Sequence, residues 1–178
     1  MRVIAGTAKG TRLVAPRLRQ LRATTDAMRE TLFNVLAERI VGARFLDLFA
    51  GCGAVGIEAL SRGAEWCTFV EVSPRCVRAI RENLERARLG ARAEVHRRDA
   101  ARAVRRVGER ESYDIVFADP PYGYEGLAEL VTAVPGQREA SAEGGVVVIQ
   151  HARRASLPDE PTPDQVKRFG ESVMSFYW

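Results

Sequence analysis

The chain has 178 residues and a mass of 19.7 kDa, which suits one domain of ordinary size and leaves little room for two. Its composition, 46% hydrophobic and 28% charged, excludes a disordered chain. The sequence contains no apolar run long enough for a membrane helix and no signal-peptide pattern, and its three cysteines have no Cys-x-x-Cys spacing. We therefore expect a cytoplasmic protein, with no membrane partner and no disulfide framework.

The formal net charge of +4 is distributed unevenly along the chain. Residues 1–30 hold seven basic and two acidic side chains, residues 75–110 hold twelve and five, and residues 111–178 are acidic. Two basic segments on an otherwise acidic chain favour a polyanionic partner such as a nucleic acid. Solvation of an outer helix face would by itself explain many arginines of the second segment, so the first is the better candidate for nucleic-acid contact.

Strands and helices are predicted to alternate along the chain. Unbroken apolar runs indicate buried strands, and apolar residues at helical spacing indicate the helices between them. In chain order we expect a short hairpin at 2–4 and 12–14, a helix that is capped by Asp26 and closed by Gly42, strand 44–49, helix 54–62, strand 66–72, a helix that Ser73 caps and Gly90 ends, strands 93–96, 113–118 and 145–150, and a final antiparallel hairpin at 166–169 and 173–177. This order predicts a three-layer α/β fold, with helices on both faces of a mostly parallel sheet.

A glycine-rich turn follows the strand at 44–49. Gly51, Gly53 and Gly56 form Gly-x-Gly-x-x-Gly where a strand turns into a helix, which lets a ligand approach the backbone closely. Glu71 ends the next strand, where an acid can accept hydrogen bonds from ribose hydroxyls. Together these features predict an adenosine-containing cofactor.

Asp47 lies just before these glycines and bears on which cofactor binds. A carboxylate there would repel the pyrophosphate of a dinucleotide, which binds at a helix N-terminus. S-adenosylmethionine carries an ammonium and a sulfonium and no phosphate, so Asp47 favours it over a nicotinamide cofactor. A role for Asp47 in capping backbone amides of the loop stays open at this point.

A second motif, Asp119-Pro120-Pro121-Tyr122, follows the strand at 113–118. Two prolines stop the strand and create a rigid projection at the carboxyl edge of the sheet, where open α/β sheets bind ligands. Asp119 and a proline carbonyl can accept hydrogen bonds from a base amine, and Tyr122 offers a face for stacking. Orientation of that amine toward a methyl donor would be the main catalytic effect.

The two motifs resemble those of class I S-adenosylmethionine-dependent amino-methyltransferases. More closely, the chain resembles the RsmD-type bacterial 16S rRNA (guanine-N2)-methyltransferases. The matching stretches span most of the chain: Arg2–Gly6 with Gly10–Leu13, Thr24–Asp26 with Arg29–Asn34, Phe45–Gly63, Asp119–Tyr122 and Arg168–Gly170. The resemblance implies a Rossmann-like, seven-stranded sheet, S-adenosylmethionine as methyl donor, and a guanine of 16S rRNA in the small ribosomal subunit as substrate.

The resemblance also assigns roles to residues and regions. It divides the chain into an RNA-facing extension, 1–25, and a compact methyltransferase domain, 26–178. Cofactor contacts are expected from Asp47, Phe49, Ala50, Gly51, Gly53, Gly56, Glu71, Val72, Asp99 and Ala100; catalytic contacts from Asp119, Pro120, Pro121 and Tyr122; and RNA contacts from Arg2, Lys9, Arg12, Thr24, Thr25 and Arg29. The chain departs from the family at Cys52, where serine is usual, and at Ala23, where proline is usual.

Other readings stay open at this stage. Asp-Pro-Pro-Tyr also occurs in adenine-N6 methyltransferases acting on DNA or RNA, although 178 residues leave little room for a DNA target-recognition domain. A nucleic-acid-binding protein that has lost catalysis and a nicotinamide oxidoreductase are further alternatives. His96 and His151 share no metal-ligand spacing, so no metal is expected, and nothing in the sequence indicates an obligate dimer.

Overall fold

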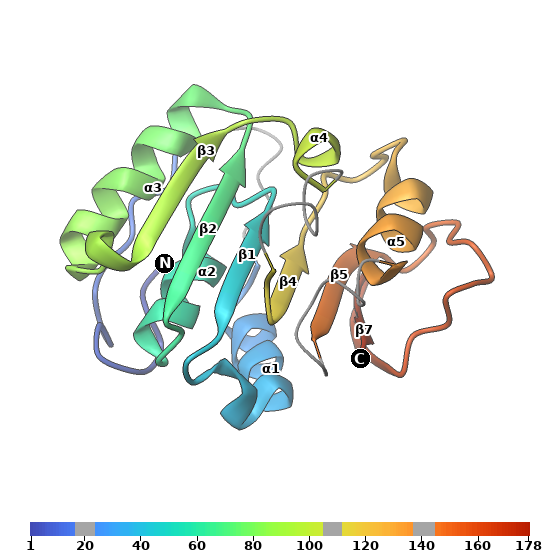
Figure 1. Cartoon of the computed structure of the whole chain (residues 1–178), viewed down its shortest axis with the longest axis horizontal. Coiled ribbons are helices and arrows are strands. Elements are labelled where there is room, and N and C mark those ends of the chain that lie inside the picture. Colours follow the sequence, from blue (N-terminus) through green and yellow to red (C-terminus); the bar gives the residue numbers. More distant parts are fainter. Residues whose placement is uncertain (17–23, 105–111, 137–144) are drawn as a thin grey trace.

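The computed structural model describes residues 1–16, 24–104, 112–136 and 145–178, and its described part contains a seven-stranded sheet (Figure 1). The strands are β1 (Arg44–Leu48), β2 (Trp66–Glu71), β3 (Ala93–Arg97), β4 (Ile115–Ala118), β5 (Val146–Ala152), β6 (Gln165–Phe169) and β7 (Ser172–Tyr177). Their order is β3-β2-β1-β4-β5-β7-β6. β1 to β5 pair in parallel, and β7 pairs antiparallel with both β5 and β6. The predicted Rossmann-like sheet with an antiparallel C-terminal hairpin is confirmed.

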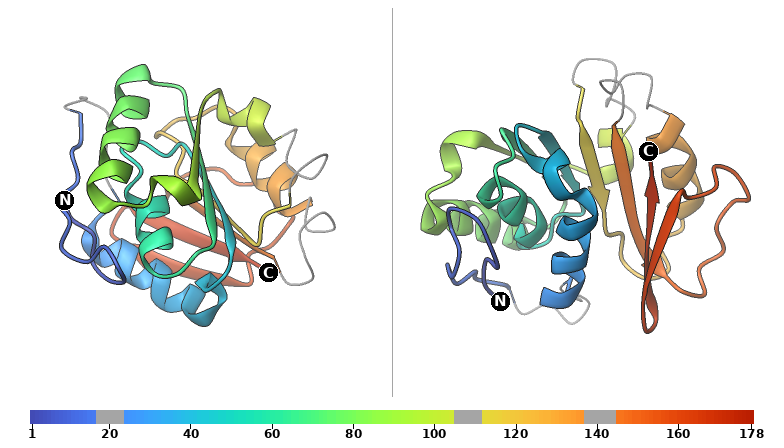
Figure 2. Two further views of the ribbon diagram at one scale, coloured as in Figure 1. Left: turned by 60° about the vertical axis from the view of Figure 1, so that its left-hand side comes forward. Right: turned by 90° about the horizontal axis from the view of Figure 1, so that it is seen from below.

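Helices cover both faces of this sheet (Figure 2). They are α1 (Asp26–Leu36), α2 (Ala54–Ser61), α3 (Pro74–Ala87), α4 (Ala100–Val104) and α5 (Leu127–Gly136), with 3-10 turns η1 (Ala37–Ile40) and η2 (Gly90–Arg92). One core cluster joins α1, α2 and α3 to the sheet, and a second joins α4 and α5 to the opposite face. Side chains alternate along β1, so Phe45 packs in the first cluster and Leu46 in the second. Asp47 consequently points toward α2.

Three helix ends differ from the prediction. The α-helix expected to close at Gly42 ends at Leu36, because Ala37 has φ of 45°, and the chain continues as the 3-10 turn η1. Thr25, not Asp26, is the N-cap of α1, because the Thr25 hydroxyl accepts the Met28 amide at 3.3 Å. α3 ends at Ala87 instead of continuing to Gly90, because Arg88 adopts a left-handed conformation with φ of 58°. The Ser73 cap of α3 is as predicted. The sequence analysis did not identify α4 and α5.

The N-terminal residues form a hairpin that packs on the α/β core. Its pairing is a single antiparallel bridge between Arg2 and Arg12, less regular than the predicted strands. Val3, Ala8 and Leu13 are buried in the same cluster as α1, α2 and α3. The hairpin therefore shares its apolar core with the rest of the chain.

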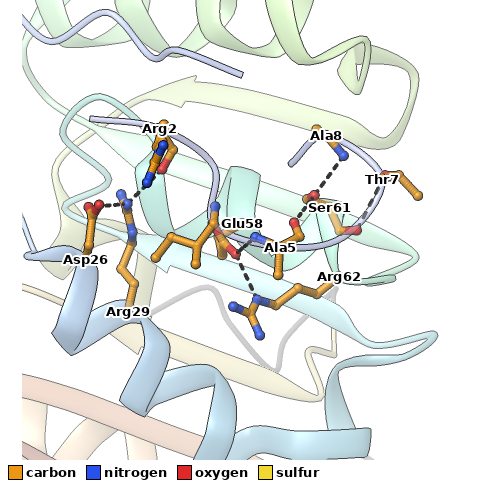
Figure 3. Close-up of polar contacts among 10 residues, drawn as sticks. Arg2, Ala5, Thr7, Ala8, Asp26, Arg29, Glu58, Ser61 and Arg62 are labelled. Atoms are coloured by element: carbon orange, nitrogen blue, oxygen red, sulfur yellow. Dashed lines mark hydrogen bonds and ion pairs between the residues drawn. The ribbon is translucent and has the colours of Figure 1, made fainter. Parts of the chain in front are cut away.

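Glu58 on α2 holds this hairpin by its backbone (Figure 3). The side chain is fully buried, and its two carboxylate oxygens accept the amides of Ile4 and Ala5 at 2.8 and 2.9 Å. Arg62, one turn further along α2, donates to Glu58 at 2.8 Å. A buried carboxylate is stable when its lone pairs are used in this way. The helix that follows the glycine turn is thus the anchor of the N-terminal hairpin.

Candidate active site

The glycine turn is tied to the end of β2 by backbone hydrogen bonds. Gly51 and Gly53 have φ of 57° and 80°, values that favour glycine, and Gly53 is the N-cap of α2. The amides of Gly51 and Ser73 donate to the two Glu71 carboxylate oxygens, both at 2.8 Å. Each oxygen keeps a further lone pair, so the half-buried carboxylate can still accept from ribose hydroxyls. The residues present therefore fit an adenosine-containing cofactor.

Asp47 is buried behind this turn and caps α2. Its Oδ2 accepts the Gly56 amide at 2.9 Å, which is the capping role that the sequence left open. Burial raises the pKa of Asp47 to about 8; the Gly56 hydrogen bond opposes this rise, and the nearby Asp119 and Glu71 carboxylates add to it. Gly56 packs so closely on β2 that a Cβ would lie 2.4 Å from a Phe69 ring carbon. A cation bound near Asp47 would favour its charged form.

Phe49 links the glycine turn to the second motif. Its φ of 60° is unusual for a bulky residue, and such strain concentrates at ligand sites. Its ring contacts Tyr124 edge to face, with the ring centroids 5.1 Å apart. Next to it, the Ala50 amide donates to the Val70 carbonyl at 3.0 Å. The strained residue therefore lies between the cofactor turn and the segment that follows β4.

The remaining predicted cofactor residues lie beyond β2 and β3. Val72 follows Glu71 and is 64% exposed, leaving an apolar surface beside that carboxylate. Asp99 is exposed, and its Oδ1 accepts the Arg102 amide at 3.2 Å at the start of α4, whereas Ala100 is buried. Val72 and Asp99 are therefore accessible, and Ala100 is not.

The Asp-Pro-Pro-Tyr segment leaves the sheet directly after β4. Asp119 Oδ2 accepts the Thr24 hydroxyl at 3.3 Å, although Thr24 is 95 residues away in the sequence. Burial raises the pKa of Asp119 to about 7, against the lowering effect of the Thr24 hydrogen bond. Pro120 is buried, Pro121 is exposed, and half-exposed Tyr122 shares a 2.8 Å hydrogen bond with Ser172.

A cavity of about 400 Å³ opens beside this segment. Its lining comprises Asp119–Glu125, Leu127, Ala128, Gln150–Ala152 and Arg154–Ser156. A volume of this size suits a small ligand or a nucleobase. The sequence analysis did not assign Tyr124 or the residues at the end of β5 to the site. The sequence feature that could have indicated these residues is Gln150. It is a polar residue at the end of the apolar run of β5, at the same edge of the sheet where Asp119 follows β4.

The residues expected to contact RNA fall into two groups. Arg2, Lys9 and Arg12 are exposed on the N-terminal hairpin. Arg29 is fully buried and donates to the Arg2 carbonyl and to Asp26, both at 2.8 Å (Figure 3). Arg29 therefore does not line an exposed surface here; it fastens the hairpin to α1.

The two threonines before α1 also have structural partners. Thr24 is buried against Asp119, and Thr25 caps α1. Ala23 lies outside the described residues. Cys52, the other departure from the family, is buried, and Cys67 and Cys76 are also free buried thiols.

Within the described ranges, no group of three His, Cys, Asp or Glu side chains is placed to hold a metal ion. The helices described there are also too short or too polar to cross a membrane.

These observations define the class of protein. The seven-stranded sheet, with the glycine turn after β1, the acid that ends β2 and the Asp-Pro-Pro-Tyr segment after β4, has the fold of the class I S-adenosylmethionine-dependent methyltransferases. A solved structure of a hypothetical protein from Thermus thermophilus superposes with a TM-score of 0.84 at 31% identity, covering 99% of this chain and 98% of that chain.

Relatives define the family more closely. The family model described as conserved hypothetical protein 95 matches residues 1–178. YlbH of Bacillus subtilis is 40% identical over 160 residues, 89% of this chain and 86% of that protein. Ribosomal RNA small subunit methyltransferase D of Escherichia coli K12 is 36% identical over 161 residues, 90% of this chain and 79% of that protein. The chain belongs to this family, the RsmD family of rRNA methyltransferases.

Proposed function

We propose that this protein transfers a methyl group from S-adenosylmethionine to the exocyclic N2 amine of a guanine in 16S rRNA of the small ribosomal subunit. The observation that carries the proposal is the position of Asp119. This carboxylate lies at the edge of a nucleobase-sized cavity, and it is close enough to Asp47 to raise the pKa of Asp47. The names of relatives from Escherichia coli and Buchnera aphidicola, small-subunit rRNA methyltransferases, support the substrate. This substrate would place the enzyme in the cytoplasm.

The proposed cofactor contacts use groups that are already oriented. Glu71, held by two backbone amides, would accept from the ribose hydroxyls, and the glycine turn would face the methionine part. Val72 and Asp99 would contact the adenine. When bound, S-adenosylmethionine supplies a methyl group made electrophilic by its sulfonium.

The proposed catalysis is mainly orientation of the target amine. The guanine N2 lone pair is delocalised into the ring, so the free amine is a poor nucleophile. Asp119 and a proline carbonyl of the motif would accept hydrogen bonds from the two N2 hydrogens and direct the nitrogen lone pair at the methyl carbon. Tyr122 would stack on the base.

The proton balance uses Asp119. As the N2–carbon bond forms, the carbon–sulfur bond breaks with its electron pair left on sulfur, and the amine loses one proton. A carboxylate whose pKa is about 7 can accept that proton near neutral pH and release it to solvent afterwards.

The exposed cations of the N-terminal hairpin would supply sequence-independent contact with RNA phosphates. Arg2, Lys9 and Arg12 extend from a hairpin that is anchored on α1 and α2, so their positions relative to the cavity are constrained. Such contacts increase affinity and are weakened by salt.

The test is tritium transfer from methyl-labelled S-adenosylmethionine to small subunits from a strain that lacks the endogenous enzyme. The expected product, identified by mass spectrometry, is N2-methylguanosine. Matched DNA and RNA fragments serve as competing substrates. Product on DNA alone, or N6-methyladenosine in place of N2-methylguanosine, would overturn the proposal.

A further inference from the structure

Gln150 lines the cavity and, among the described residues, has a buried, unpaired amide oxygen. The residue is 7% exposed, lies in β5 and lines the cavity beside Asp119. Within the described part of the chain, its Oε1 is buried without a hydrogen-bond partner. A buried acceptor left unpaired costs free energy, so native structures rarely keep one without a reason. A donor that arrives with a ligand would remove this cost.

The topology places Gln150 on the strand beside the one that leads to Asp119, the carboxylate proposed to hold the target amine. Ala118 of β4 and Ile149 of β5 are register partners on neighbouring parallel strands. Asp119 and Gln150 each follow one of these partners, and such strands lie about 4.8 Å apart. Register neighbours in a parallel sheet share a face, and the residues that follow these two partners both line the cavity.

Two other polar side chains of the lining already have hydrogen-bond partners. His151 uses both ring nitrogens, Nδ1 toward the Ala152 carbonyl and Nε2 toward Ser175, each at 2.9 Å. Tyr122 is hydrogen-bonded to Ser172. Among the described residues of the lining, Asp119 and Gln150 therefore both have acceptor capacity left, and the Gln150 oxygen has no hydrogen-bond partner at all.

We propose that Gln150 Oε1 accepts the N1–H of the target guanine and makes the cavity selective for guanine over adenine. This assignment rests on the proposed function. In guanine the N1–H donor is adjacent to the N2 amine, so one base edge would meet Asp119 and Gln150 together. In adenine the ring nitrogen beside the amine is an acceptor, and it would face the amide oxygen in repulsion. Gln150 is thus a specificity-determining residue that contacts the substrate without taking part in bond making.

The test compares two bases that carry the same reacting amine. Small subunits are reconstituted with guanine or with 2,6-diaminopurine at the methylated position; diaminopurine keeps the 2-amine but has an acceptor at N1. Gln150→Leu removes the acceptor, Gln150→Glu keeps it, and Gln165→Leu on β6, outside the cavity lining, is the matched control. S-adenosylmethionine affinity and the thermal transition are measured for every variant to separate recognition from folding.

We expect the native enzyme and Gln165→Leu to prefer guanine over diaminopurine by roughly 10- to 100-fold in kcat/KM. Gln150→Leu should lose most of that preference through a slower reaction on guanine, whereas Gln150→Glu should retain it. A Gln150→Leu enzyme that keeps the full preference would overturn the assignment while leaving the proposed function intact. A native enzyme that methylates no guanine in the particles would overturn both.

Discussion

The two halves of the sheet's carboxyl edge are built in different ways. Between β1 and β2, carboxylates are held by backbone amides: Glu71 by Gly51 and Ser73, and Asp47 by Gly56. Between β4 and β5, the carboxylate of Asp119 is held by a side chain from the distant segment before α1, beside a cavity.

This difference suggests that the glycine turn mainly serves stability and the cavity mainly serves reactivity. The backbone amides that hold Glu71 and Asp47 belong to segments next to these carboxylates. The same segments take part in the packing of α2 on β2. The groups that line the cavity come from the segment after β4, the start of α5, the end of β5 and the segment after it, and Asp119 among them is hydrogen-bonded by Thr24 from before α1. Changes at the glycine turn should therefore affect folding and cofactor affinity, whereas changes around the cavity should affect methyl transfer.

The largest effect is expected for Asp119→Ala. Loss of the acceptor that orients the amine should lower kcat by roughly 10²- to 10⁴-fold, while affinity for S-adenosylmethionine stays within a fewfold. Methyl transfer and calorimetric titration of the cofactor measure the two quantities. Asp159→Ala, at an exposed loop position, is the control. Retention of near-native activity in Asp119→Ala would contradict the assigned role of Asp119, and loss of cofactor binding together with activity would contradict the separation of the two halves.

Gly56→Ala should destabilise the fold. The added Cβ would lie 2.4 Å from a Phe69 ring carbon and 2.6 Å from the Cys67 sulfur, so we expect a loss of about 1–3 kcal/mol in unfolding free energy. Gly90→Ala is the matched control, because a Cβ there meets no atom within 4 Å and should change stability by no more than about 0.5 kcal/mol. Urea denaturation of both variants gives the comparison, and equal stabilities would show that α2 does not depend on this close packing.

The affinity for S-adenosylmethionine should rise with pH. Burial holds the pKa of Asp47 near 8, so the carboxyl is largely neutral below that pH, and a bound cation favours its charged form. Binding then releases a proton, and affinity should increase by up to about tenfold per pH unit below 8 and level off above it. Asp47→Asn should make the affinity nearly independent of pH in this range. Any titration of S-adenosylmethionine itself affects both proteins equally, so the difference between them reports Asp47. A parallel dependence in the two proteins would remove Asp47 from cofactor recognition.

The smallest effect is expected for Thr24→Val. The Thr24 hydrogen bond stabilises the charged form of Asp119, so its removal should raise the pKa of Asp119 above about 7. Because the charged carboxylate is the better acceptor and proton carrier, activity should rise with pH through this pKa, with the midpoint shifted upward by a few tenths of a unit in the variant. Thr31→Val, whose hydroxyl bonds only within α1, is the control in this pH–rate profile. A downward shift would contradict the assigned role of Thr24.

Much of the cofactor side could be predicted from sequence because its determinants are local. The glycine spacing, the Ser73 cap and the acid at the end of β2 each act within one turn or one strand, so their chemistry is visible in short stretches. The predicted helix ends were wrong where a neighbouring residue could cap or end the helix instead. Thr25 capped α1 in place of its neighbour Asp26, and Arg88 took the left-handed conformation that Gly90 was expected to take.

The sequence by itself determined the order of the strands and of the first three helices, the glycine turn with its acid, and the placement of Asp-Pro-Pro-Tyr after a buried strand. Tertiary structure alone decided that Arg29 is buried under the N-terminal hairpin and not exposed to RNA, that Thr24 meets Asp119, and that Gln150 ends beside the same cavity. The physical reason is that hydrophobic periodicity and turn chemistry act over a few residues, whereas burial and hydrogen-bond pairing depend on which distant segments the sheet brings together.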